Sequence, residues 1–311
     1  MCGFSPSIMS SLANVADLQK KFSSSIDPYE IDLFLARAIG KSREFLWTHP
    51  EYTLSPQEKS YFTRSIRRRQ KHEPVAYILG SKEFFGLDFK VNKHTLIPRP
   101  ETELMVEEII RYAKSDIQPN ESKEKKTLIV DTGTGSGNII VSLAKQFLSD
   151  TSKQAAYKFF GLDISSGALS IARSNARRHD VGKNITFKHS DLLSTLLPLL
   201  NHSKKYSRVI IAANLPYLSK EIYQSSMSDV KKFEPKSALY SPEHGLQHYR
   251  KLFDQIKDIL QIQTQISFDL FLEISPEQKP LLSKTVKQFF PRAKVTFKKD
   301  LAQKWRLACI F

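Results

Sequence analysis

Residues 128–138 read Leu-Ile-Val-Asp-Thr-Gly-Thr-Gly-Ser-Gly-Asn, and this stretch is the strongest indication of the fold class. An apolar run leads into three glycines at alternate positions, and a helical apolar pattern follows. Such a strand–turn–helix sequence is typical of the first strand of an α/β sheet. Glycine lets the backbone turn sharply and pass close to a ligand, although a turn of this kind can also serve only to pack a helix on a strand. The sequence predicts a ligand-binding turn that consists of Asp131, Gly133, Thr134, Gly135, Ser136 and Gly137.

This turn differs from two common phosphate-binding motifs. It has no Gly-Lys-Ser/Thr, so it is not the phosphate loop of nucleotide hydrolases. Asn138 stands where a dinucleotide-binding turn has its third glycine.

Strand and helix patterns alternate after the turn. Helical stretches are expected near residues 138–148, 166–179, 246–261 and 277–289. This alternation favours a parallel sheet with helices on both faces and with ligands at the carboxyl ends of its strands. The last two strands are joined by a short loop, so they are expected to form an antiparallel hairpin. The expected strands are Leu128–Asp131, Lys158–Asp163, Ile185–His189, Val209–Ala213, Ser267–Ile274, Lys294–Lys298 and Arg306–Phe311.

The N-terminal part of the chain has helical patterns. Asp27-Pro28 and Ser55-Pro56 each place a capping residue before a proline, and Gly40 is a natural helix end. Residues 82–92 resemble a short hairpin around Gly86, and the polar residues 115–126 an exposed loop. We therefore predict a helical domain at residues 1–80, a β-hairpin linker at 81–95 and the α/β domain at 96–311.

Composition limits the partners. The formal net charge is +15 and the isoelectric point about 9.6, which favours an acidic partner. Two cysteines exclude a disulfide scaffold and a cysteine-rich zinc site. The sequence shows neither a signal peptide nor a membrane span, so we expect a cytoplasmic protein without a membrane partner. The basic run Arg67–Lys71 fits either a solvated helix end or a surface for an acidic partner.

Two carboxylates follow expected strands. Asp163 ends the second strand and can accept both hydroxyls of a ribose, which fits an adenosyl ligand. Asp191 follows the third strand, where it can accept the amine of adenine while Leu192 covers the ring. Either aspartate can alternatively be a helix cap.

Asn214-Leu215-Pro216-Tyr217 follows the fourth strand and is the most specific motif. It combines an uncharged acceptor, a backbone stiffened by proline and an aromatic face in one tight turn. That set can hold a planar NH2 group, with two acceptors for its two protons and a ring that stacks on its flat body.

Together these motifs resemble class I S-adenosylmethionine-dependent methyltransferases that act on a conjugated nitrogen. Residues 97–103, Ile-Pro-Arg-Pro-Glu-Thr-Glu, are similar to the signature of the HemK/PrmC family. Residues 233–239, 245–250 and 299–304 also resemble that family.

The resemblance implies a Rossmann-like seven-stranded sheet with an antiparallel C-terminal hairpin, preceded by a helical substrate-binding domain. It implies methyl transfer from S-adenosyl-L-methionine to the side-chain amide of a glutamine, in a Gly-Gly-Gln-type loop of class 1 peptide-chain release factors. Asn214, Leu215, Pro216 and Tyr217 would hold that amide, and Asn214 would also border the donor. By resemblance, Arg99 would bind the donor's carboxylate and Glu103 its ammonium group. No metal and no dedicated base are expected, and we expect a monomer.

One position departs from the family pattern. The family usually has two prolines between the asparagine and the tyrosine, and the first is Leu215 here. The backbone carbonyl that would accept an amide proton is kept, and Pro216 still favours extended geometry at residue 215. The loss is one of rigidity, worth about 0.4–1 kcal/mol.

Two alternatives remain. An RNA or DNA adenine N6-methyltransferase would use the same grip on a planar NH2, and the positive charge fits nucleic acid. Asn-Leu-Pro-Tyr also resembles the motif of ribosomal RNA adenine dimethyltransferases. A non-catalytic adaptor that binds S-adenosylmethionine would have the donor site without transfer.

Overall fold

The chain divides into two compact units in a computed structural model, which describes residues 14–115, 126–149, 156–202, 205–225 and 228–311. One unit contains the described residues up to Gly80 together with Ser228–Phe233, and the other contains the rest. The strands β1 (Ser81–Phe84) and β2 (Leu87–Lys90) form a hairpin, and β1 begins the second unit. The predicted polar loop falls mostly outside the described residues.

The first unit is helical. Asp27 caps α2 by accepting a hydrogen bond from the Tyr29 backbone N–H, and Gly40 ends that helix in the left-handed conformation. Ser55 and Glu58 form a complete capping box at the start of α4. The helices are α1 (Val15–Phe22), α2 (Pro28–Ile39), α3 (Arg43–Thr48), α4 (Pro56–Gln70), α5 (Val75–Leu79) and α11 (Ser228–Phe233).

Apolar residues at helical spacing form the core of this unit. Ile31, Phe34 and Leu35 from α2 are buried against Phe62 and Ile66 from α4, as the periodicity predicts. The α1 and α3 helices, which the pattern did not predict, add further side chains to the same cluster.

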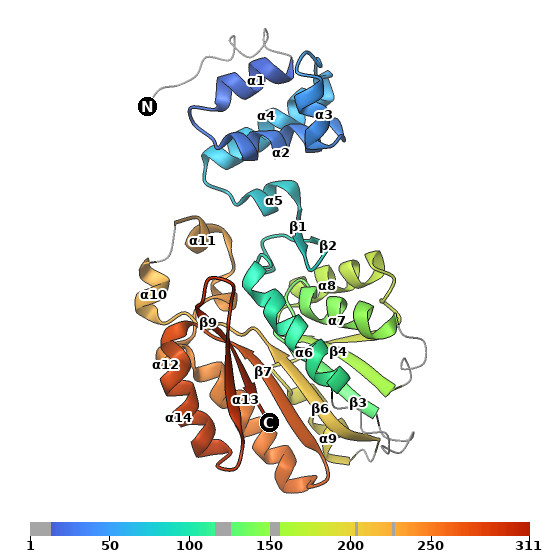
Figure 1. Ribbon diagram of the computed structural model, residues 1–311, viewed down its shortest axis with the longest axis vertical. Helices are drawn as coiled ribbons and strands as arrows, with labels where there is room; N and C mark the ends of the chain where they lie inside the picture. Colours follow the sequence, from blue (N-terminus) through green and yellow to red (C-terminus); the bar gives the residue numbers. More distant parts are fainter. Residues whose placement is uncertain (1–13, 116–125, 150–155, 203–204, 226–227) are drawn as a thin grey trace. The chain divides into compact units, whose positions relative to one another are not determined.

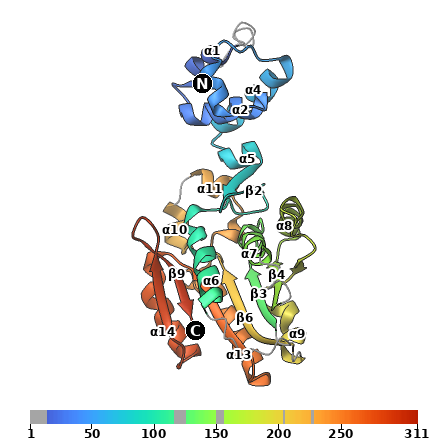
Figure 2. The same ribbon diagram turned by 45° about the vertical axis from the view of Figure 1, so that its right-hand side comes forward.

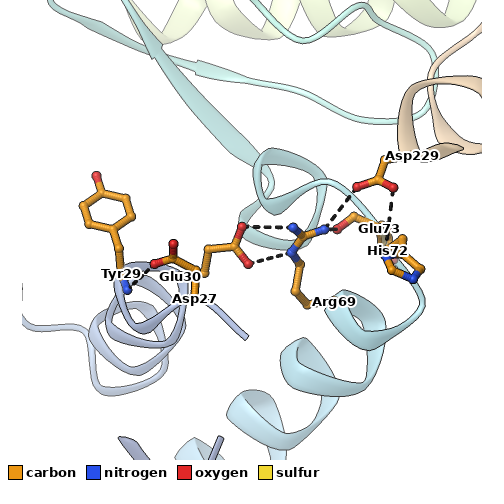
Figure 3. Close-up of polar contacts among 7 residues, drawn as sticks. All are labelled: Asp27, Tyr29, Glu30, Arg69, His72, Glu73 and Asp229. Atoms are coloured by element: carbon orange, nitrogen blue, oxygen red, sulfur yellow. Dashed lines mark hydrogen bonds and ion pairs between the residues drawn. The ribbon is translucent and has the colours of Figure 1, made fainter. Parts of the chain in front are cut away.

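Two arginines of the basic run at the end of α4 form ion pairs within this unit, and Figure 3 shows those of Arg69. Arg68 binds Glu73 with a nitrogen–oxygen distance of 2.6 Å. Arg69 makes two hydrogen bonds to Glu30, at 2.6 and 3.0 Å, and a third contact to Asp229 of α11 at 3.3 Å. These two arginines therefore hold the helices of this unit together.

The second unit contains a seven-stranded sheet in the order β5-β4-β3-β6-β7-β9-β8 (Figure 1). Neighbours from β5 to β7 are parallel, and β9 is antiparallel to both β7 and β8. The predicted fold class and its terminal hairpin are thus confirmed. The strands are β3 (Lys126–Thr132), β4 (Tyr157–Asp163), β5 (Ile185–His189), β6 (Tyr206–Ala213), β7 (Ser267–Glu273), β8 (Val295–Lys299) and β9 (Trp305–Ile310), and the separate hairpin is β1 (Ser81–Phe84) with β2 (Leu87–Lys90).

Helices cover both faces of the sheet (Figure 2). Alternate strand residues point to opposite faces, so Leu128 and Val130 pack with one set of helices and Ile129 with the other. One face carries α6 (Glu103–Ser115), α7 (Asn138–Leu148) and α8 (Ser166–Arg178), and the other α9 (Leu197–His202), α13 (Gln247–Ile262) and α14 (Lys279–Phe289). Two short helices, α10 (Lys220–Ser225) and α12 (Pro242–Gly245), follow β6.

In the described part of the chain, every helix is too short or too polar to cross a bilayer.

Candidate functional site

A pocket of about 300 Å³ lies at the carboxyl ends of β3, β4, β5 and β6. Parallel strands end at one edge of a sheet, so residues far apart in sequence meet there. Most of the predicted site residues line this pocket: Arg99, Gly133, Thr134, Gly135, Ser136, Asp163, Asp191, Leu192, Asn214, Leu215 and Pro216. Among the described residues, those that line it do not include Glu103, Asp131, Gly137 or Tyr217.

The glycine turn has the backbone geometry that glycine allows. Gly133, Gly135 and Gly137 have φ values of 73°, 55° and 81°, which other residues rarely adopt. The backbone N–H groups of Gly133 and Thr134 both donate to the Leu162 carbonyl at 2.8 Å, which ties the turn to β4. Gly137 packs against α8, because a Cβ atom there would lie 3.1 Å from the Cβ of Ala172. Gly137 therefore shapes the turn, while Gly133 and Gly135 border the pocket.

Asp131 lies beneath this turn and is fully buried. Its Oδ2 accepts a hydrogen bond from the Thr134 hydroxyl at 2.6 Å, which holds the turn from below. Burial raises the pKa of the Asp131 carboxyl to about 7. The structure thus gives Asp131 a contact with the turn, whereas the sequence suggested contact with the ligand.

Asp163 borders the pocket and is not the cap of α8. Its two carboxylate oxygens accept hydrogen bonds from the backbone N–H groups of Gly135 and Ser165, each at 2.8 Å. Each oxygen keeps a lone pair for a donor in the pocket. Burial raises the pKa of Asp163 despite these two bonds. Ser165 itself caps α8 by accepting from the Ala168 N–H.

Asp191 and Leu192 border the pocket in different ways. The Asp191 carboxylate is half exposed and pairs with Lys251, so it does not cap a helix. Its backbone carbonyl accepts from the side-chain amide of Gln255 at 3.2 Å. Leu192 has a φ of 53° and is buried, with its side chain in the pocket wall.

Asn214 is held by a hydrogen-bond chain. Its Nδ2 donates to Thr102 Oγ1 at 3.2 Å, and Thr102 Oγ1 donates to Glu273 Oε2 at 2.6 Å. Thr102 and Glu273 are both buried, and burial raises the pKa of Glu273 to about 7. Glu273 is the last residue of β7, so the chain joins the neighbouring ends of β6 and β7.

The rest of the Asn214–Tyr217 turn is tightly packed. Leu215 is buried, with its Cδ2 3.0 Å from the position that a Cβ on Gly133 would occupy. A Cβ on Gly245 would lie only 2.0 Å from the Tyr217 carbonyl oxygen, so that position requires glycine. Burial raises the pKa of the Tyr217 hydroxyl, with the nearby charge of Glu273 as a second cause.

Arg99 and Glu103 have protein partners. The Arg99 guanidinium lies 2.6 Å from the Glu234 carboxylate, which is buried and also accepts from the Ile97 N–H at 3.2 Å. Arg99 still borders the pocket. Glu103 accepts from the Phe85 N–H at 2.9 Å and so fixes the β1–β2 hairpin.

Comparisons with known proteins match the helical N-terminal part of the chain and its α/β part separately. Residues 16–80 match the PrmC N-terminal domain, and residues 123–266 match a methyltransferase domain. The release factor glutamine methyltransferase of Clostridium botulinum is 31% identical over 91% of this chain and 92% of its own length. That of Nitratidesulfovibrio vulgaris is 34% identical over 74% of this chain and 70% of its own length. The chain belongs to the release factor glutamine methyltransferase family.

One further relative has a similar identity to this chain, and a solved structure has a much lower one. The release factor glutamine methyltransferase of Buchnera aphidicola is 35% identical over 75% of this chain and 74% of its own length. Among solved structures, a human methyltransferase 10 domain containing protein has a TM-score of 0.48 and 16% identity, over 73% of this chain and 88% of that chain.

Sequence reasoning gave no role to several residues at this site, among them Thr102 and Glu273. Thr102 lies within the Ile97–Glu103 stretch that carries the family resemblance, but it was given no role there. Glu273 had the same signal that singled out Asp163, a carboxylate at the end of an apolar strand. Neither residue could be connected to Asn214 without the strand order.

Proposed function

We propose that this protein methylates the side-chain amide nitrogen of a glutamine in a class 1 peptide-chain release factor, with S-adenosyl-L-methionine as donor. The family membership supports the reaction and its protein substrate. One observation carries the proposal to this chain's own residues: Asn214 and Leu215 lie in the same pocket wall as the glycine turn. A nitrogen held by the first motif would therefore face a donor held by the second.

The donor part of the pocket fits an adenosyl ligand. Gly133 and Gly135 carry no side chains that would block close approach of a ligand. Asp163 borders the pocket with a free lone pair on each oxygen, as two ribose hydroxyls would require. Leu192 supplies apolar surface on the same wall.

The residues of the acceptor turn must make a poor nucleophile react. S-adenosyl-L-methionine supplies a methyl group on a positively charged sulfur, which is already a good electrophile. An amide nitrogen is a weak nucleophile because its lone pair is delocalised into the carbonyl. Asn214 Oδ1 and the Leu215 carbonyl would accept the two amide protons, which fixes the direction of the nitrogen and raises its electron density. Positioning of this kind can lower a barrier by several kcal/mol.

The same acceptors stabilise the reaction as charge develops. A carbon–nitrogen bond forms while the carbon–sulfur bond breaks, and the sulfur takes the bonding pair. Positive charge then grows on the nitrogen, next to two oriented acceptor oxygens. The nitrogen, positively charged after the transfer, then loses one proton to water. Tyr217 would limit the space beside the amide plane, in keeping with its place next to the pocket-lining residues of the turn.

A labelling experiment tests the function. The protein is incubated with donor that carries a labelled methyl group and with purified release factor, and the modified peptide is identified by mass spectrometry. We expect label on the loop glutamine and none when that glutamine is replaced by alanine. Label in ribosomal RNA and not in the release factor would contradict the proposal, as would donor binding without transfer.

We further propose that the protein acts as a monomer without a nucleic-acid partner. Because release factors work on ribosomes, we expect it to meet its substrate in the cytoplasm.

A further inference from the structure

The hydrogen bonds around Asn214 have a defined direction. Thr102 has one hydroxyl proton, and its short contact of 2.6 Å to the Glu273 carboxylate shows where that proton goes. Towards Asn214, the Thr102 oxygen can then only accept. The Asn214 carboxamide must therefore present its NH2 group to Thr102.

This direction leaves one atom of Asn214 available. Its Oδ1 accepts no hydrogen bond from the described residues, and it is not among the buried unpaired atoms, so it is open to a ligand. Without Thr102, the carboxamide could rotate by half a turn, because its two ends have nearly the same shape. A rotated Asn214 would present NH2 to the substrate's NH2, and the two donors would repel each other.

We propose that Thr102 and Glu273 are positioning residues, which hold Asn214 with Oδ1 towards the glutamine amide. This inference rests on the proposed function and deepens it. Neither residue needs to touch the reacting atoms. Glu273 sets the direction of the Thr102 proton, and Thr102 sets the orientation of the Asn214 carboxamide.

The protonation state of Glu273 gives the proposal a signature in pH. Once protonated, the Glu273 carboxyl can donate to Thr102, and the Thr102 proton becomes free to point at Asn214. Oδ1 can then turn towards Thr102, and the productive orientation is lost. The pKa of Glu273 is raised to about 7, chiefly by burial. The charged and titratable groups that face it are Arg99 and Glu101 before α6, Tyr217 in the turn, Tyr249 on α13 and Arg306 on β9.

Three variants of the whole protein test the chain of bonds: Thr102→Val, Thr102→Ser and Glu273→Gln. Valine keeps the shape of threonine but neither donates nor accepts, whereas serine keeps the hydroxyl. At saturating donor and release factor, we expect Thr102→Val to lower kcat on the order of tenfold or more, as one lost hydrogen bond predicts. Thr102→Ser should recover most of kcat. Donor affinity should stay close to that of the wild type in both variants. The melting temperature should stay close to it in Thr102→Ser and fall in Thr102→Val, because valine leaves the buried Glu273 carboxylate without this hydrogen bond.

The pH profile separates positioning from a merely structural role. Wild-type kcat should fall as pH drops below about 7, and Glu273→Gln should remove that fall, because glutamine does not titrate. Saturation with donor removes any effect of Asp131 on donor binding, which matters because its pKa lies in the same range beneath the donor turn. Wild-type kcat in Thr102→Val, or an unchanged low-pH fall in Glu273→Gln, would overturn the inference. If wild-type protein did not label the glutamine at all, the proposed function would fail instead.

Discussion

The side chain of Leu215 packs directly on Gly133, with its Cδ2 3.0 Å from the place of a Cβ on that glycine. The first residue belongs to the proposed acceptor turn and the second to the proposed donor turn. Leu215 stands where the family usually has proline, so this contact belongs to the leucine side chain. The two turns are therefore in van der Waals contact, and a change in either one reaches the other.

Gly133→Ala should weaken donor binding strongly. The new Cβ would meet Leu215 in a backbone conformation that already disfavours alanine by about 1–2 kcal/mol. We expect donor affinity to fall at least tenfold, as measured by calorimetric titration. Gly86→Ala is the matched control, because Gly86 has a φ of 72° and no atom within 4 Å of the new Cβ. Equal losses of donor affinity in both variants would refute a specific role for the contact with Leu215.

Asn214→Ala should reduce turnover much more than donor binding. The variant removes one acceptor and leaves a substrate proton without a partner, which costs roughly 1–3 kcal/mol. This cost corresponds to a loss of kcat of about five- to 150-fold. Steady-state rates with release factor and an independent donor titration check the expectation. A parallel collapse of donor affinity would instead show that Asn214 supports the fold of the pocket.

Asp163→Ala should weaken the binding of the donor and hardly change the binding of the protein substrate. The variant removes the two carboxylate oxygens that hold the Gly135 and Ser165 N–H groups and that face the pocket. We expect the donor KM to rise at least tenfold, while the release factor KM at saturating donor changes little. Asp191→Ala, which removes an exposed carboxylate paired with Lys251, should have the smaller effect of the two. The reverse order would reassign the ribose contact.

Buried carboxyls make the stability of the fold depend on pH. The pKa of Asp131 is raised by burial to about 7 in the folded protein, above its value in the unfolded chain. Its contribution to stability is therefore fully present below the unfolded pKa and is lost as pH rises through about 7. Each pKa unit is worth about 1.4 kcal/mol, so the effect of this one group can reach a few kcal/mol.

Melting curves measure this effect in the wild type and in Asp131→Asn. Asparagine keeps an oxygen that can accept from Thr134 but does not titrate. We expect the wild-type melting temperature to fall between about pH 5 and pH 8, and this fall to be smaller in the variant. Identical slopes in the two proteins would show that Asp131 is not the source.

The Arg69 ion pairs should contribute modestly to stability. The side chains of Arg69 and Asp229 are 23% and 29% exposed, so solvent screens their attraction and a coupling of about 0–1 kcal/mol is expected. A double-mutant cycle with Arg69→Ala and Asp229→Ala, followed by denaturant unfolding, measures it. Arg69→Ala alone should cost more than Asp229→Ala, because it also leaves Glu30 without its two hydrogen bonds. The opposite ranking would contradict the arrangement in Figure 3.

Local patterns carried most of the fold. Apolar runs between helical stretches located the strands of the sheet, and capping residues located the starts of α2 and α4. The convergence of Gly133, Asp163 and Asn214 on one pocket followed from the rule that parallel strands share a carboxyl edge.

Tertiary partners decided what the sequence could not. From the sequence, Arg99 was matched to a ligand carboxylate. In the structure Arg99 pairs with Glu234, which is far away in the sequence. Glu103 was likewise matched to the ligand's ammonium group, whereas in the structure it accepts a hydrogen bond from the Phe85 backbone N–H of the hairpin. Thr102 gave no signal of its own, because a hydroxyl acquires a role only from what it touches. The sequence thus predicted the positions of helices and strands better than the partners of charged and hydroxyl side chains.

The membership of α11 in the helical unit has a practical consequence for anyone who wishes to dissect the protein. Ser228–Phe233 comes late in the sequence yet completes a unit that otherwise ends at Gly80. The polypeptide therefore enters that unit twice, and one cut after Gly80 would not release either half intact. A fragment that starts at Ser81 would carry an orphaned helix, and a fragment that stops at Gly80 would lack Asp229, the acidic neighbour of Arg69. Domain exchanges between relatives would have to transplant both pieces together.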